Sequence, residues 1–132
     1  MLTRLLVSAG TFVIGLALIG YSVRARRGRS PAARTWMGNE FGSFRRDERM
    51  TVLGAPVIGG MCWCFTMTAL PVVGTYLMLV ALPIAALLFL ALVIVLLPFV
   101  PLPDAVYPRW ARPLRERNRR TEKAVKAWLR RR

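Results

Sequence analysis

The sequence predicts an all-α integral membrane protein with three transmembrane helices, the second and third forming a hairpin, and a C-terminal basic amphipathic helix. Two observations predict this fold class. Residues 52–100 carry no Asp, Glu, Lys or Arg, and a run of this length is typical of helices that cross a bilayer. Apart from Arg4, every Lys and Arg lies in residues 24–49 or 109–132, whereas a soluble domain distributes its charges along amphipathic elements.

The first transmembrane helix is expected within residues 1–23. Residues 5–23 are free of charge and long enough to cross a bilayer once. A cleavable signal peptide is the alternative, with Val23 and Ala25 in the small-residue positions. We favour a retained helix because the apolar segment is long for a signal and Arg24 would lie inside the cleavage site.

A basic loop is expected in residues 24–51. Gly, Ser and Pro within residues 28–31 predict a turn at the exit of the first helix. Trp36 and the aromatic residues that follow it alternate with charges, as is typical of chain at the level of lipid head groups. Ser43 is the candidate N-cap of a helix that enters the membrane through Arg49.

A transmembrane hairpin is expected in residues 52–103, with spans at 52–70 and 76–97 and a turn at 71–75. Pro83 is expected to kink the third helix because it removes one backbone hydrogen bond. The third span holds 15 Leu, Ile, Val or Phe residues, which favour insertion by roughly 5–9 kcal/mol. The second span holds only 6, so we expect other parts of the protein to cover it.

Candidate helix-packing residues form two lines of small side chains. On the second span they recur at spacings of 4, 3, 4 and 3 residues: Ala55, Gly59, Cys62, Thr66 and Ala69. On the first span they recur every seventh residue: Ser8, Gly15 and Ser22. Small residues let helix backbones approach in lipid, where packing drives association. Two alternatives follow: the lines pack against each other, or the line on the second span pairs with a second copy.

The distribution of basic residues predicts the orientation in the membrane. Residues 24–50 hold 8 basic and 3 acidic residues, and residues 104–132 hold 11 basic and 3 acidic residues. A hairpin between them places both segments on one side, which the positive-inside rule identifies as the cytoplasm. We therefore expect a multi-pass protein of the cell membrane, inner or plasma, with its N-terminus outside.

No catalytic residue, metal site or cofactor is predicted. Cys62 and Cys64 are the two cysteines and there is no His, so soft metal ligands fall short of the usual four. Residues two apart on a helix do not face each other, which argues against a disulfide. Asp47 and Glu48 are adjacent among arginines and project in different directions. An enzyme or an ion-coupled transporter is disfavoured, since the latter usually places a charge within the membrane.

The basic tail, residues 104–132, is the strongest functional signal. A helix is expected from Pro113, with an apolar face formed by Leu114, Thr121, Val125, Trp128 and Leu129. The candidate lipid- or partner-binding residues are Arg109, Arg112, Arg115, Arg117, Arg119, Arg120, Lys123, Lys126, Trp128 and Arg130. Each basic residue near an anionic leaflet contributes up to about 1 kcal/mol. A docking site for a protein, a nucleic-acid site, and arginines that only set the topology are the alternatives.

These patterns favour a non-catalytic accessory or scaffold subunit that docks through its cytoplasmic basic face. The expected partners are anionic membrane lipids and either another membrane protein or a second copy, with nucleic acid less favoured. A pore former is the first alternative, because three-span phage holins look similar in architecture, although the loop 24–50 is long for that plan. A membrane-tethered nucleic-acid binder, for example in plasmid transfer, is the second, because Trp110 and Trp128 accompany the basic charge.

Overall fold

Three helices of the computed structural model are long and apolar enough to cross a membrane: Leu2–Arg27, Met50–Ala69 and Gly74–Leu96. The structure describes residues 1–34, 36, 49–97 and 99–132, and this part of the chain contains helices and no strand. The prediction of an all-helical protein compatible with several membrane crossings is confirmed at this level. The predicted Ser43 cap and the Asp47–Glu48 pair lie outside the described residues.

Helix α1, Leu2–Arg27, is longer than the apolar segment 5–23 that predicted it. Arg is a good helix former, so the basic residues that flank the apolar segment continue the helix at both ends. The helix ends at Gly28, whose φ of 55° and ψ of 29° lie in the left-handed region that favours glycine. The Gly28 N–H donates to Arg24 O at 3.2 Å, and the short helix α2, Pro31–Arg34, follows. The chain therefore leaves the helix within the region predicted as a turn, residues 28–31, but Pro31 already belongs to α2.

The second apolar segment begins with a π-helical turn, Met50–Gly54, and continues as α4, Ala55–Ala69. Pro56, in the first turn of α4, has no N–H to donate, so the backbone bonds around it are rearranged. Residues 70–73 lead into α5, Gly74–Leu96, within two residues of the predicted boundaries. Helix α5 continues through Pro83 as a single element, and a kink there stays a prediction.

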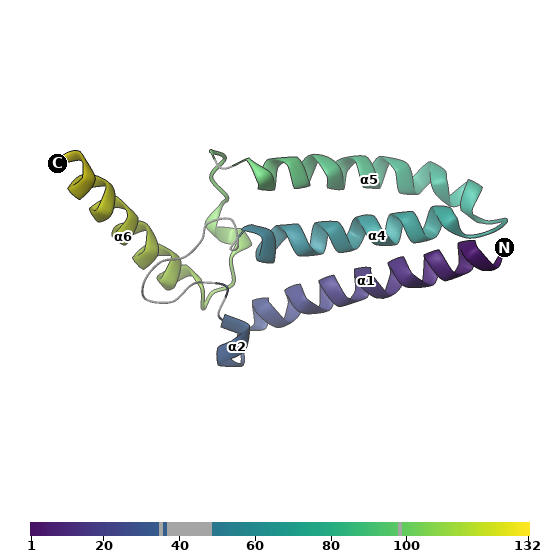
Figure 1. Ribbon diagram of the computed structural model, residues 1–132, viewed down its shortest axis with the longest axis horizontal. Helices are drawn as coiled ribbons and strands as arrows, with labels where there is room; N and C mark the ends of the chain where they lie inside the picture. Colours follow the sequence, from purple (N-terminus) through teal and green to yellow (C-terminus); the bar gives the residue numbers. More distant parts are fainter. Residues whose placement is uncertain (35, 37–48, 98) are drawn as a thin grey trace.

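Helix α4 lies between α1 and α5 and contacts both (Figure 1). The buried share of its most apolar window is 39%, against 11% in α1 and in α5. The weakly apolar helix therefore occupies the covered position, while the strongly apolar α5 keeps most of its surface exposed. This arrangement agrees with the insertion energies, because burial in protein removes the need for α4 to be stable in lipid alone.

The chain termini lie at opposite ends of the three apolar helices (Figure 1). Arg4 and the turn from α4 to α5 lie at one end. At the other end the chain leaves α5, forms a 3₁₀ turn at Asp104–Val106 and enters helix α6, Arg112–Arg130. Helix α6 projects away from the end of the bundle at which α1 ends and α4 begins (Figure 1), so the described basic residues other than Arg4 share this end.

Candidate docking site at the basic end of the helices

The two lines of small residues meet where α1 crosses α4. A Cβ atom at Gly15 would lie 2.9 Å from Gly59 O, and a Cβ atom at Gly59 would lie 3.0 Å from Gly15 O. Ser8, Ser22 and Ala55 are also buried. The structure therefore brings the Ala55–Gly59 part of the α4 line against α1 of the same chain rather than leaving it free for a second copy.

Nearer the N-terminal end of α1, the same contact is polar and aromatic. Thr66 Oγ1 and Thr11 Oγ1 lie 2.9 Å apart across the two helices, and Thr66 also donates to Cys62 O at 2.9 Å. Phe12 stacks on Trp63 with ring centroids 5.8 Å apart. Sequence reasoning missed the α1 partners, although Thr11 lies three residues after Ser8 and thus on the same helix face. Two further members of the α4 line, Cys62 and Ala69, are half-buried.

Another face of α4 packs on α5. A Cβ atom at Gly60 would lie 3.1 Å from Leu88 Cδ1, and Val57 and Cys64, three residues before and four after Gly60, are buried. On α5, Ala81 is buried. The spacing of Val57, Gly60 and Cys64 could have signalled this face, which the sequence analysis did not single out.

Two side chains of α1 bind the backbone carbonyls that Pro56 leaves without a partner. The N–H of residue 56 would serve Val52 O in an α-helix or Thr51 O in a π-helix, and proline has none. Arg26 donates from its guanidinium group to Val52 O at 2.9 Å, and Ser22 Oγ donates to Thr51 O at 3.4 Å. Because Val52 is fully buried, an unsatisfied carbonyl there would be costly. Helix α1 therefore completes the start of the second span.

Arg26→Met is expected to lower the free energy of unfolding by about 1.5–3 kcal/mol, because it removes a charged donor from a buried carbonyl. In a Pro56→Ala background, which restores the N–H of residue 56, the same replacement is expected to cost less. The measurement is a double-mutant cycle of thermal stability in detergent, with Arg4→Met as a control on the same helix. Equal costs of Arg26→Met in both backgrounds would contradict the assignment.

A small apolar cluster, here called the basal cluster, joins the start of α6 to the apolar helices. Its buried members are Ala25, Trp36, Val52, Leu102, Tyr107 and Ala111, with Leu53, Val106, Trp110 and Leu114 packed against them. They come from the end of α1, from position 36 after α2, from the π-helical turn, and from the 3₁₀ turn and the chain on either side of it. This cluster fixes the first turn of α6 at the end of the bundle.

Hydrogen bonds to the last carbonyls of α1 surround the basal cluster. Trp36 Nε1 donates to Ala25 O at 3.3 Å and Trp110 Nε1 donates to Arg26 O at 2.8 Å. Arg34 donates to Gly28 O and its guanidinium lies 5.5 Å from the centroid of the Trp110 ring. The final carbonyls of a helix lack backbone partners and carry partial negative charge, so these donors satisfy them.

Two further arginines bind backbone carbonyls near the end of α5. Arg49, before the second span, donates to Leu97 O and Val100 O, and so links the beginning of one helix to the end of the next. Arg115 on α6 is 9% exposed. It donates to Leu102 O at 2.9 Å and pairs with Asp104.

The ring of Tyr107 lies 4.0 Å beneath the Arg115 guanidinium. Arg115 therefore differs from the other predicted docking residues, because it is buried and its guanidinium group binds within the fold.

The remaining predicted docking residues lie on the exposed part of the tail: Arg109, Arg112, Arg117, Arg119, Arg120, Lys123, Lys126, Trp128 and Arg130. Arg112 also donates to Tyr107 O at 3.3 Å. Arg120 pairs with Glu116 at 2.6 Å, but both side chains are more than 60% exposed, so this pair stabilises little. Trp128, at 54% exposure, is accompanied by the exposed Val125 and Leu129. Helix α6 thus presents basic and apolar side chains that the rest of the described chain leaves uncovered.

The described residues contain no group of three His, Cys, Asp or Glu side chains that could hold a metal ion, and Cys62 and Cys64 are both free thiols. A comparison of the chain with protein-family models, with curated proteins and with solved structures finds no match. The functional conclusion therefore depends on geometry and charge.

Proposed function

We propose that this chain is a non-catalytic integral membrane protein, an accessory or scaffold subunit that docks acidic partners through its basic cytoplasmic face. The observation that carries the proposal is how α6 is attached to the apolar helices. Its first turn is held by Arg115 and the basal cluster, while its remaining turns project from the bundle with their basic and apolar side chains exposed (Figure 1). Because the first turn of α6 is fixed, the helix loses less conformational entropy on binding than a flexible basic tail would lose.

Charge supports the proposed orientation in the membrane. Of the 20 basic residues, 19 follow the first span, and those described lie at the end of the bundle opposite Arg4. We propose that α4 and α5 form a membrane hairpin, so that both basic segments are cytoplasmic and the N-terminus is outside. The docking face of α6 then meets the cytoplasmic side of a neighbouring membrane protein and the anionic leaflet beside it.

The test extracts the full chain from native membranes in polymer nanodiscs and analyses the mass and composition of the particles. The wild type is expected to carry a second protein at fixed stoichiometry. A variant with Gln at Arg117, Arg119, Arg120, Lys123, Lys126 and Arg130 is expected to lose it. A variant with Lys at the four arginines is the matched control, since it keeps the charge and, with the untouched basic residues of the loop, the orientation.

Other compositions of the particles would contradict the proposal. A homo-oligomer that carries only anionic lipid would contradict the accessory role and favour the pore former. A pore former is expected to collapse the membrane potential when its expression is induced. Co-purified nucleic acid that persists at about 0.15 M salt would favour the nucleic-acid binder, because purely electrostatic binding weakens steeply with salt. Retention of the partner by the Gln variant would show that α6 is not the docking face.

A further inference from the structure

Three arginines at the corner between α1 and α2 differ from the other basic residues near the basal cluster. Arg24, Arg27 and Arg29 line a cavity of about 310 Å³, together with Gly20, Val23, Ser30 and Ala33. Among the described residues, none of these three guanidinium groups makes a hydrogen bond or an ion pair. Arg26 and Arg34, by contrast, donate to backbone carbonyls. The three arginines therefore retain their full capacity to bind an anion.

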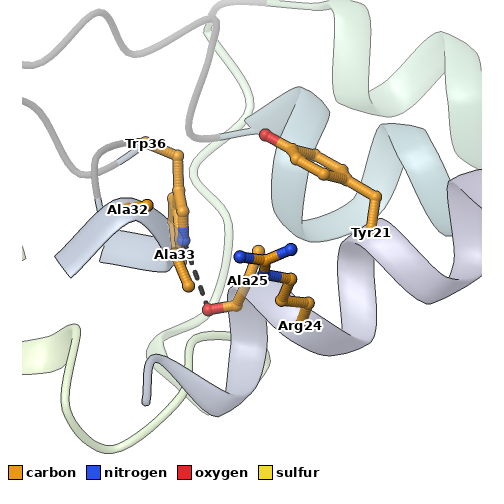
Figure 2. Close-up of a pocket in the computed structure, with 6 residues that line it drawn as sticks. All are labelled: Tyr21, Arg24, Ala25, Ala32, Ala33 and Trp36. Atoms are coloured by element: carbon orange, nitrogen blue, oxygen red, sulfur yellow. Dashed lines mark hydrogen bonds between the residues drawn. The ribbon is translucent and has the colours of Figure 1, made fainter. Parts of the chain in front are cut away.

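The cavity has an apolar side and a basic side. Gly20 and Val23 belong to the apolar stretch of α1, and Val23 is 43% exposed. A smaller pocket of about 120 Å³ adjoins it through the shared residues Arg24 and Ala33. Figure 2 shows Tyr21 and Trp36 on opposite sides of Arg24 in this second pocket. Aromatic rings with one polar end are typical of the level where lipid head groups meet the hydrocarbon.

We propose that this corner is a binding site for an anionic phospholipid of the cytoplasmic leaflet. The guanidinium groups of Arg24, Arg27 and Arg29 bind the phosphate of the head group, because planar guanidinium matches phosphate oxygens with paired hydrogen bonds. None of the described residues that line the two pockets is an Asp or a Glu.

An acyl chain lies along Gly20 and Val23, which a free phosphate ion would leave uncovered. The site belongs to α1 and α2 and does not depend on the docking role of α6.

The test measures phospholipid binding to the full-length protein. The detergent-purified protein is placed in phosphatidylcholine nanodiscs with or without phosphatidylglycerol, and retained lipid is counted by native mass spectrometry. Arg24→Gln/Arg27→Gln/Arg29→Gln is expected to weaken phosphatidylglycerol binding at least tenfold, about 1.4 kcal/mol. The control Arg119→Gln/Arg120→Gln/Arg130→Gln removes the same charge from α6 and is expected to retain the lipid. Thermal stability of the first variant is expected to stay close to wild type, since its three side chains make no hydrogen bond or ion pair with a described residue.

Two outcomes would overturn the inference. Equal loss of phosphatidylglycerol in both triple variants would mean that net charge, rather than this corner, attracts the lipid. If inorganic phosphate competed fully with lipid binding, and the site showed no preference for phosphatidylglycerol, the ligand would be a soluble anion. Partner extraction by the Arg24, Arg27 and Arg29 variant is expected to be unchanged, so failure of this site and failure of the α6 proposal give different results.

Discussion

Gly15→Leu is expected to separate α1 from α4, while Gly10→Leu on the same helix leaves the bundle intact. At Gly15 even a Cβ atom would lie 2.6 Å from Trp63 Cδ1 and 2.9 Å from the backbone oxygen of Gly59. At Gly10 a Cβ atom meets nothing within 4 Å. Overpacking costs about 1–3 kcal/mol where side chains can yield, and a backbone oxygen cannot yield without moving the whole helix.

The separation of α1 from α4 is measured by the rate at which a disulfide forms between them. Thr11→Cys and Thr66→Cys, in a background with Ala at Cys62 and Cys64, replace two hydroxyl oxygens that lie 2.9 Å apart. Fast cross-linking within one chain is expected for Gly10→Leu and slow cross-linking for Gly15→Leu, with a parallel loss of thermal stability in detergent. Gly59→Leu is expected to act in the same direction. Unchanged cross-linking in Gly15→Leu would make the small residues incidental, and a cross-linked dimer would support pairing with a second copy.

Arg115→Leu is expected to release α6 from the end of the bundle. The replacement leaves Leu102 O without its donor and removes the group that stacks on Tyr107. Asp104 is 66% exposed, so its share of the loss is screened by water, and the buried hydrogen bond dominates. A loss of about 2–3 kcal/mol is expected, which raises the detached population of α6 roughly 30- to 150-fold.

Spin labels on Leu16 of α1 and Ala124 of α6 measure the release as a distance distribution. The distribution is expected to be narrow in the wild type and broad in Arg115→Leu. Arg119→Leu removes an exposed arginine from the same helix and is the matched control, for which a narrow distribution is expected. A broad distribution in the wild type would show that the first turn of α6 is not fixed to the bundle. That result would contradict the proposed docking function, which depends on a fixed first turn.

Hydropathy predicted the apolar helices well because their boundaries depend on local composition. The uncharged run between Arg49 and Asp104 marks two spans directly, and glycine at position 28 marks the end of α1 through its left-handed conformation. The boundaries moved by a few residues where arginine continued a helix past the apolar segment. The sequence analysis did not predict the π-helical turn at Met50–Gly54, although Pro56 follows it closely. Which side chains bind the carbonyls near Pro56 depends on the packing of α1.

The sequence predicted some residues of the candidate sites and could not distinguish others. Small residues on two spans indicated a close approach and left two alternatives, packing of the two lines on each other or pairing with a second copy. The structure brings Gly15 against Gly59 within one chain, which depends on tertiary packing. Among the arginines, the sequence could not separate Arg115 and Arg26 from Arg24 and Arg27. A basic residue that binds a buried carbonyl and one that remains unpartnered have the same local pattern.

The sequence by itself determined that the chain is helical, that three segments are apolar enough to cross a membrane, and that almost all positive charge follows the first of them. These properties depend on the composition of consecutive residues, which sets the cost of leaving water. Only the tertiary structure decided that α4 is the covered helix and that Arg115 fixes the first turn of α6. It also decided that three arginines line a cavity at the α1–α2 corner. These depend on which side chains meet across the fold, and residues such as Arg26 and Val52 are brought together by packing that no local pattern encodes.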